Sequence, residues 1–246
     1  HKAIKLKPEF DDALTNLGFI YIALKKFKEA EKFTRKALII NPNASMALNN
    51  LATILFESKE FKEAERIINK AISLRPKFPE ALNLLGKIYI ESNKFKEAEK
   101  LLRNSIKLKP KNSTAYIHLA TTLNKMKKVD EAKKAILTSL NIDANNANAH
   151  YFKGLIDRDM GEFKNASTAL SRAIKINPSL TEIQIAQGRL CRDVGLLEKS
   201  NLILQSAYEN ESSTIRHQSE IMVDLLINSV VSRDFRLTKE YLLKIK

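Results

Sequence analysis

The chain has 246 residues, of which 44 % are hydrophobic, and it carries a formal net charge of +14. Its single cysteine, Cys191, excludes an internal disulfide and any zinc site built from several cysteines. No apolar run reaches the roughly 18 residues that a membrane-spanning helix needs, and the first residues lack a secretory signal pattern, so we expect a cytoplasmic protein.

The basic excess lies mainly in the N-terminal half and consists mainly of lysine. Nucleic acid is one partner that such a charge attracts. The chain has no tryptophan, and aromatic residues make up only 7 % of it, so few side chains are available to stack on bases. We therefore interpret the lysines as a solvated face. Nucleic-acid binding is kept as a third hypothesis, which a steep salt dependence of binding would support.

The stretch from Leu17 to Pro42 recurs along the chain with a period of 34 residues, which is typical of a repeat architecture. Four prolines follow this spacing: Pro8, Pro42, Pro76 and Pro110. Small residues occupy one equivalent position in six units: Gly18, Ala52, Gly86, Ala120, Gly154 and Gly188. Bulky residues occupy another: Phe27, Phe61, Phe95, Val129, Phe163 and Leu197.

Each unit reads as two amphipathic helices. In the first unit, apolar and small residues recur at intervals of three and four from Ala13 to Tyr21 and again from Phe27 to Ile40. Pro42 then ends the second helix, because proline cannot continue a helix interior. One such pair cannot bury its apolar faces alone, so neighbouring units must stack. The register gives six units: 11–42, 45–76, 79–110, 113–144, 147–178 and 181–212.

The unit resembles the tetratricopeptide repeat. The matching residues in the first unit are Leu14, Leu17, Gly18, Tyr21, Ala30, Ala37 and Pro42, and those in the third are Leu82, Leu85, Gly86, Tyr89, Ala98 and Pro110. The resemblance implies an all-α, right-handed superhelical solenoid of tandem 34-residue helix-turn-helix repeats. It also implies that the first helices line a concave groove in which family members bind peptides or proteins.

Both ends of the sequence depart from the register. Residues 1–10 match the end of a repeat through Ala3, Ile4 and Pro8, so we expect a truncated unit there. Beyond residue 212 the landmark residues disappear, although two helices are still expected, at 215–231 and 235–245. We interpret 213–246 as an irregular helical pair that forms a terminal cap, since an array needs an end without an exposed apolar face. A tether to a further domain is the alternative.

No signature of reaction chemistry is found. Four of the six glycines belong to the packing series and Gly161 and Gly195 to the turn between helices, so none remains for a phosphate-binding loop. His118 and His150 lie at inequivalent positions of adjacent units and do not form a metal-ligand pattern. We expect no catalytic residue, no cofactor and no metal.

Function is therefore expected on the groove wall. The predicted partner-binding residues are Asn49, Asn83, Lys87, Thr121, Asn124, Arg158, Arg189 and Arg192. Amide side chains both donate and accept hydrogen bonds, so they can hold an extended peptide backbone. Asn49, Asn50 and Asn83 partly match the asparagine ladder of tetratricopeptide arrays on protein glycosyltransferases. The pattern that clamps the C-terminal carboxylate of chaperones fails at Thr15, Phe19 and Glu80.

The fifth and sixth units break the pattern. Lys153 and Asp157 replace the residues equivalent to Leu17 and Tyr21, and their spacing of four places them on one helix face. One hypothesis is a polar junction that binds an acidic partner segment through the nearby arginines or serves as a flexible point. The other, which we favour, is a local Lys153–Asp157 ion pair on a slightly rotated helix.

The leading functional hypothesis is a non-catalytic protein–protein interaction scaffold that binds a peptide or protein segment in the groove. The alternative is a substrate-targeting arm of a larger enzyme of the glycosyltransferase, sulfotransferase or hydroxylase type. A catalytic domain in the full-length gene would favour the alternative. Neither hypothesis identifies the partner or the oligomeric state, because fold alone does not specify either.

Overall fold

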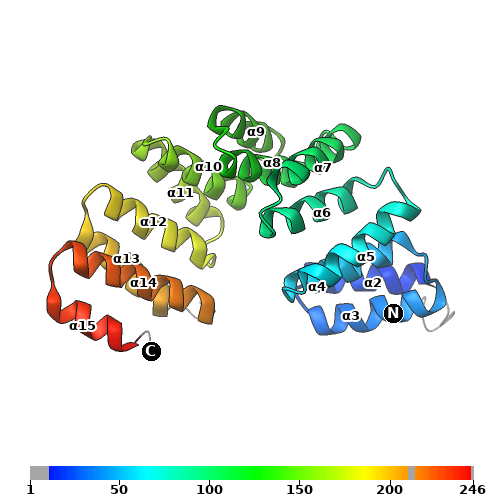
Figure 1. Cartoon of the computed structure of the whole chain (residues 1–246), viewed down its shortest axis with the longest axis horizontal. Helices are drawn as coiled ribbons and strands as arrows, with labels where there is room; N and C mark the ends of the chain where they lie inside the picture. Colours follow the sequence, from blue (N-terminus) through cyan, green and yellow to red (C-terminus); the bar gives the residue numbers. More distant parts are fainter. Residues whose placement is uncertain (1–10, 210–213, 245–246) are drawn as a thin grey trace. The chain divides into compact units, whose positions relative to one another are not determined.

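The computed structural model describes residues 11–209 and 214–244, and within them the chain is all-helical, without strands. The helices follow one another as hairpins (Figure 1). Their bounds are α2 Asp11–Ala23, α3 Phe27–Ile40, α4 Ser45–Glu57, α5 Phe61–Leu74, α6 Pro79–Glu91, α7 Phe95–Leu108, α8 Ser113–Lys125, α9 Val129–Ile142, α10 Ala147–Asp159, α11 Phe163–Ile176, α12 Thr181–Asp193, α13 Leu197–Glu209, α14 Ile215–Val231 and α15 Phe235–Lys244. The predicted all-α repeat fold is confirmed. None of these helices has the length and hydrophobicity that crossing a bilayer requires.

The turn inside each hairpin is built from one residue with positive φ. Gly161 and Gly195 take this conformation as expected, and Lys25, Lys59, Asn93 and Lys127 take it at the equivalent positions. The next residue returns its N–H to a carbonyl five positions back, as Lys26 does to Tyr21 at 2.9 Å and Glu162 to Asp157 at 2.8 Å. This bond closes the first helix and satisfies a carbonyl that the helix end would leave unpaired.

The small residues of the first helices allow the two helices of a hairpin to approach closely. A Cβ atom on Gly86 would lie 2.8 Å from Leu102 Cγ, and one on Gly154 would lie 2.7 Å from Leu170 Cγ. Leu102 and Leu170 are themselves completely buried. The glycine series is therefore a packing requirement.

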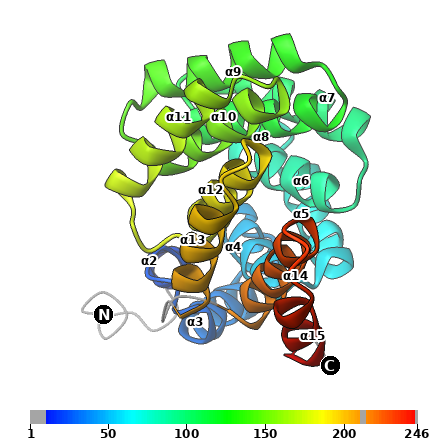
Figure 2. The same ribbon diagram turned by 90° about the vertical axis from the view of Figure 1, so that its left-hand side faces the viewer.

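The chain divides into two compact units, one ending at Met126 and the other beginning at Lys127. In the first unit, one core cluster joins α4, α5 and α6 and includes Phe78 and Ile88, which are almost completely buried. In the second unit, α10–α11, α12–α13 and α14–α15 stack in chain order (Figures 1 and 2). One apolar cluster joins Ile185 of α12 and Leu204 of α13 with Ile221 of α14, so it links two neighbouring hairpins of this stack.

The C-terminal pair differs from the other hairpins. Helix α14 has 17 residues, whereas each of the six described first helices before it has 13. The side chain of Thr214 caps it by accepting from the His217 N–H at 3.3 Å. The two helices were expected, but their outer face carries exposed valine, isoleucine, leucine and phenylalanine side chains. The interpretation of this pair as a terminal cap stays a prediction. The expected truncated repeat at 1–10 lies outside the described residues.

Candidate protein-interaction surface

Neighbouring first helices are joined by polar contacts between residues 35 positions apart. In the first unit, Asn50 Nδ2 donates to the carbonyl of Thr15 at 2.9 Å. His118 Nδ1 lies 3.0 Å from Asn83 Oδ1, and since an amide oxygen only accepts, this ring nitrogen carries the proton. Burial lowers the pKa of His118 to about 3, with a further contribution from the charge of Lys87. The imidazole is therefore neutral at physiological pH.

The asparagines predicted to line the groove divide into two kinds. Asn49 and Asn83 are half-buried at equivalent positions of α4 and α6, and Asn83 is held by His118. The Oδ1 atom of Asn49 has no hydrogen-bond partner among the described residues. Asn50 is only 2 % exposed and its amide is bound to Thr15, so it joins helices instead of facing a ligand. The partial match to an asparagine ladder thus narrows to Asn49 and Asn83.

Lys87 is fixed above an aromatic ring. Its Nζ lies 4.1 Å from the centre of the Phe56 ring and 3.2 Å from Glu57 Oε1. A cation over a ring face is attracted by the ring quadrupole, and the carboxylate adds a charge-assisted bond. The ammonium group of Lys87 is therefore oriented by the preceding first helix.

The residues predicted on α8 are less available. Thr121 is half-buried and donates from Oγ1 to the Ile117 carbonyl of its own helix at 3.0 Å. Asn124 is half-buried and already has an interaction partner. Both keep acceptor capacity, because a hydroxyl and an amide oxygen each have two lone pairs.

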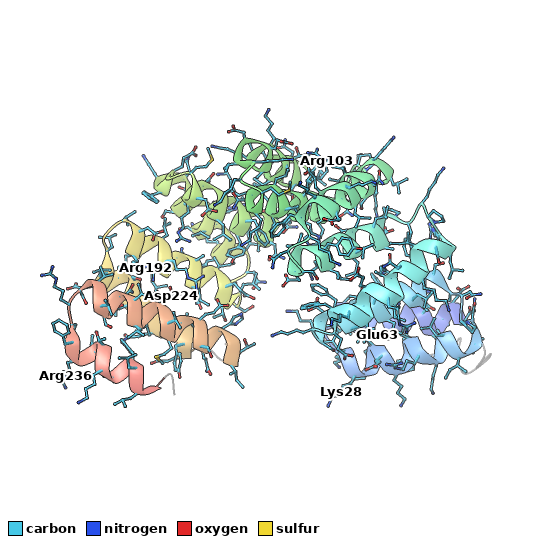
Figure 3. All side chains as sticks on the ribbon, viewed as in Figure 1. Lys28, Glu63, Arg103, Arg192, Asp224 and Arg236 are labelled. Carbon is cyan, nitrogen blue, oxygen red and sulfur yellow. The ribbon has the colours of Figure 1, made fainter. Side chains whose placement is uncertain are left out.

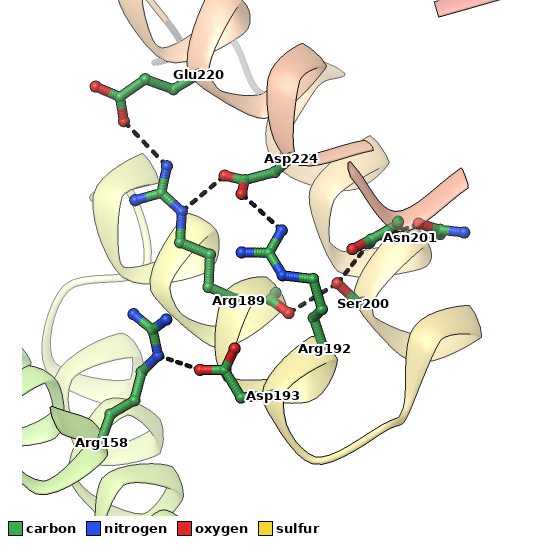
Figure 4. Close-up of polar contacts among 10 residues, drawn as sticks. Arg158, Arg189, Arg192, Asp193, Ser200, Asn201, Glu220 and Asp224 are labelled. Atoms are coloured by element: carbon green, nitrogen blue, oxygen red, sulfur yellow. Dashed lines mark hydrogen bonds and ion pairs between the residues drawn. The ribbon is translucent and has the colours of Figure 1, made fainter. Parts of the chain in front are cut away.

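All three predicted arginines lie in the second unit, and each is paired with a carboxylate of the chain (Figure 4). Arg158 on α10 bonds to Asp193 on α12. Arg189 Nε and Arg192 Nη1 both donate to Asp224 on α14, at 2.7 and 2.8 Å, and Arg189 also lies 3.7 Å from Glu220. The structure thus brings the arginines together as links between hairpins.

Asp224 and Glu220 were missed by sequence reasoning. They lie beyond residue 212, where the repeat register fades, so no landmark connected them to α12. The available signal was the separation of 35 between Arg189 and Asp224, which is the same as that between Arg158 and Asp193.

Lys153 and Asp157 form the expected ion pair within α10. Lys153 Nζ lies 2.5 Å from Asp157 Oδ2, and the Asp157 side chain is completely buried. The second oxygen, Oδ1, has no hydrogen-bond partner among the described residues. The local ion pair that we favoured is confirmed, although the buried carboxylate is only partly satisfied.

A charge reversal accompanies this ion pair. Lys133 on α9 bonds to Glu162 at 2.8 Å, and this contact holds the pKa of Glu162 below its usual value. The equivalent residues two repeats earlier are Glu65 and Lys94. They pair at 3.5 Å with the opposite arrangement of charges. Lys133 also experiences the charge of Asp157. The departures at Lys153 and Asp157 in the fifth repeat thus coincide with a reversed charge pair between the fourth and fifth repeats.

Groups that could supply chemistry are sparse in the described part of the chain. Within it, no three histidine, cysteine or carboxylate side chains are placed to hold a metal ion. Cys191 is half-buried, and burial raises the pKa of its thiol. Burial likewise raises the pKa of Tyr151 to about 12, with Glu182 as the next contribution. These shifts reflect packing between first helices and favour neither thiolate nor phenolate.

Family models match three segments of the sequence. Two models, both described as tetratricopeptide repeat, match residues 11–44 and 147–180. A third, described as anaphase-promoting complex, cyclosome, subunit 3, matches residues 57–139. Among curated proteins, none matches the sequence significantly.

Solved structures of repeat proteins share the fold. PilF of Pseudomonas aeruginosa superposes with a TM-score of 0.64 at 21 % identity, over 85 % of this chain and 95 % of that one. A thermophilic repeat protein of Thermus thermophilus gives 0.70 at 18 % identity, over 74 % and 100 %. A chain of the hetero-tetramer Cut9–Hcn1 gives 0.80 at 15 % identity, over 91 % of this chain but only 44 % of that one. At these identities the likeness concerns the fold alone.

Proposed function

The chain belongs to the tetratricopeptide-repeat family, and we propose that it is a non-catalytic scaffold that binds a peptide or protein segment on the first helices of its N-terminal unit. The observation that carries this proposal is the set of half-buried polar side chains on α4 and α6, namely Asn49, Asn83 and Lys87. We call these three residues the N-terminal wall. Protein binding is the general role of this family, and the N-terminal wall is the part of this chain to which we assign it.

The N-terminal wall suits an extended peptide. Each amide presents a donor and an acceptor, which match the N–H and C=O groups of a peptide backbone. Asn49 Oδ1 is buried without a partner within the described residues, so a rotation of the side chain that presents the amide to a ligand breaks no hydrogen bond of this oxygen. Lys87 is held by Phe56 and Glu57, so little side-chain entropy is lost when it binds an acidic or carbonyl group. Thr121 and Asn124 on α8 would extend the contact.

The arginines of the second unit form a secondary part of the proposal. A guanidinium has five N–H donors, and Arg158 and Arg189 use only some of them in their bonds to Asp193, Asp224 and Glu220. An acidic segment would therefore add to these ion pairs or compete with them. We expect a smaller contribution from Arg158, Arg189 and Arg192 than from the N-terminal wall.

Affinity capture with a matched control tests the proposal. The wall variant is Asn49→Ala, Asn83→Ala, Lys87→Ala, and the control variant removes the same residue types from exposed positions of second helices, Asn69→Ala, Asn104→Ala, Lys107→Ala. Proteins that wild type and control retain should be lost from the wall variant, and a peptide from a captured protein should bind it about tenfold more weakly. Circular dichroism checks that both variants are folded. Equal retention by the two variants would contradict the proposal.

A further inference from the structure

Helix α14 is apolar on two opposite faces. Ile221, Met222 and Leu225 point into the core that α14 shares with α13 and α15. On the opposite side, Val223, Ile227, Val230 and Val231 remain between 40 and 58 % exposed. A helix that is apolar all round is normally buried on all sides. The outer side of α14 is therefore a surface without its packing partner.

The outer side of α14 continues a face that the two preceding first helices use for stacking. Arg158 on α10 reaches α12, and Arg189 and Arg192 on α12 reach α14. The residues 34 positions after Arg189 and Arg192 are Val223 and Leu226. Apolar residues thus replace both arginines, and of the two Val223 is exposed while Leu226 packs against the core. Because α10 and α12 use these positions to contact the next first helix, we expect the occupant to be a helix.

Helix α15, which packs against α14, also carries exposed apolar side chains. Phe235, Leu242 and Leu243 are 81, 52 and 65 % exposed. We name these three residues and the four exposed residues of α14 the α14–α15 outer face: Val223, Ile227, Val230, Val231, Phe235, Leu242 and Leu243. A concentration of exposed apolar side chains on neighbouring helices is typical of interaction sites in folded proteins.

The charges around the α14–α15 outer face are mainly basic. Arg233, Arg236 and Lys239 are exposed, and Arg236 projects away from the helices at the edge of the pair (Figure 3). The acidic neighbours are largely engaged: Asp234 caps α15 by accepting from the Leu237 N–H at 3.0 Å, and Glu240 has an interaction partner. A partner that brings negative charge is therefore complementary to this rim.

We propose that the α14–α15 outer face binds an amphipathic α-helix of a partner protein whose apolar stripe is flanked by acidic residues. The spacing of Val223, Ile227 and Val230 matches the ridge that such a helix packs against. A second copy of the chain fits less well, because two basic rims would face each other in a protein of net charge +14. This site is separate from the N-terminal wall and does not depend on it.

Synthetic peptides of about 18 residues test this proposal directly. The probe carries leucines at intervals of three and four and glutamates elsewhere. One control peptide replaces the glutamates with lysines, and another permutes the sequence so that no stripe forms. In about 0.15 M salt, which screens non-specific attraction, we expect calorimetry to detect binding of the acidic amphipathic peptide only.

Two protein variants locate the binding. Val230→Ser, Phe235→Ser changes only exposed side chains of the outer face and should weaken binding about tenfold or more. Leu202→Ser removes an equally exposed leucine from α13 and should leave binding unchanged. Unchanged binding by the double variant would overturn the proposal. So would wild-type dimerisation in sedimentation that the double variant abolishes, or adsorption to anionic vesicles without peptide binding.

Discussion

Arg189 on α12 donates from Nε to Asp224 Oδ2 on α14 at 2.7 Å, across 35 positions of sequence. The same separation joins Asn50 to Thr15 and His118 to Asn83. Residues of neighbouring first helices that are separated by one repeat plus one residue therefore come into contact. These polar contacts fix the pairing of first helices, while the small residues fix the packing within each hairpin.

Removing Asp224 should destabilise the C-terminal hairpin. Its side chain is 4 % exposed and lies between Arg189 and Arg192. Asp224→Ala therefore removes this carboxylate from Arg192 and leaves Arg189 with only its longer contact of 3.7 Å to Glu220. We expect the free energy of unfolding to fall by about 3 kcal/mol in urea denaturation. Glu31→Ala breaks the exposed Arg35 pair on α3 and should cost less than about 0.5 kcal/mol. Equal losses would show that Asp224 is not a link between hairpins.

The repeat period allowed much of the fold to be predicted. A glycine such as Gly86 recurs because a side chain from the second helix, Leu102, occupies the space that a Cβ would need. Packing constraints of this kind act within one repeat and reappear in each of them. Gly161 and Gly195 were predicted in the turn between helices, where they adopt positive φ. Glycine takes this backbone conformation without a steric penalty.

The candidate site was predicted less completely, because contacts between repeats depend on three-dimensional register. Asn49 and Asn50 are adjacent in sequence. Only Asn50 is fully buried, and its side chain is bonded to the preceding first helix. The arginines were recognised, whereas Asp224 was not, since α14 is four residues longer than α12 and carries no landmark. The exposed apolar side chains of α14 were likewise not predictable. A periodic pattern shows which face of a helix is apolar, but it does not show which other helix covers that face.

His118 should make the protein less stable in mild acid. Its pKa is about 3 in the folded state, because of burial and then Lys87, and about 6.5 when unfolded. The unfolded state therefore binds the proton first, and stability falls as pH drops below about 6.5 toward 3. Between pH 7.5 and 5.0 the expected loss is about 2 kcal/mol.

His118→Leu, which places the residue of the equivalent position Leu84 on α8, should remove most of this pH dependence. Urea denaturation at the two pH values measures it. As an independent readout, the His118 ring signals in an NMR titration should not move between pH 7.5 and 5.0. A titration midpoint near 6.5 would refute a neutral, buried imidazole.

Gly86 and Leu102 should behave as a coupled pair. Gly86→Ala places a Cβ within 3 Å of two carbon atoms of the buried Leu102, so we expect a loss of about 1–3 kcal/mol despite the better helix propensity of alanine. The equivalent pair in the preceding repeat is Ala52 with Ile68, both fully buried. Adding Leu102→Ile should therefore recover much of the loss, giving a favourable coupling energy in a double-mutant cycle. Strictly additive effects would mean that the two positions do not constrain each other.

Lys153 and Asp157 should tolerate joint replacement better than the loss of the lysine alone. Lys153→Ala leaves the fully buried Asp157 carboxylate without its cation, which should cost about 3–5 kcal/mol. Lys153→Leu, Asp157→Leu instead restores the residues found at the equivalent positions 51 and 55, and it also removes the unpaired Oδ1 atom. A buried ion pair replaced by well-packed apolar side chains is often neutral or stabilising, so the double variant should unfold at the same or a higher urea concentration than wild type. A double variant as unstable as Lys153→Ala would instead indicate that the ion pair fixes the packing of α10.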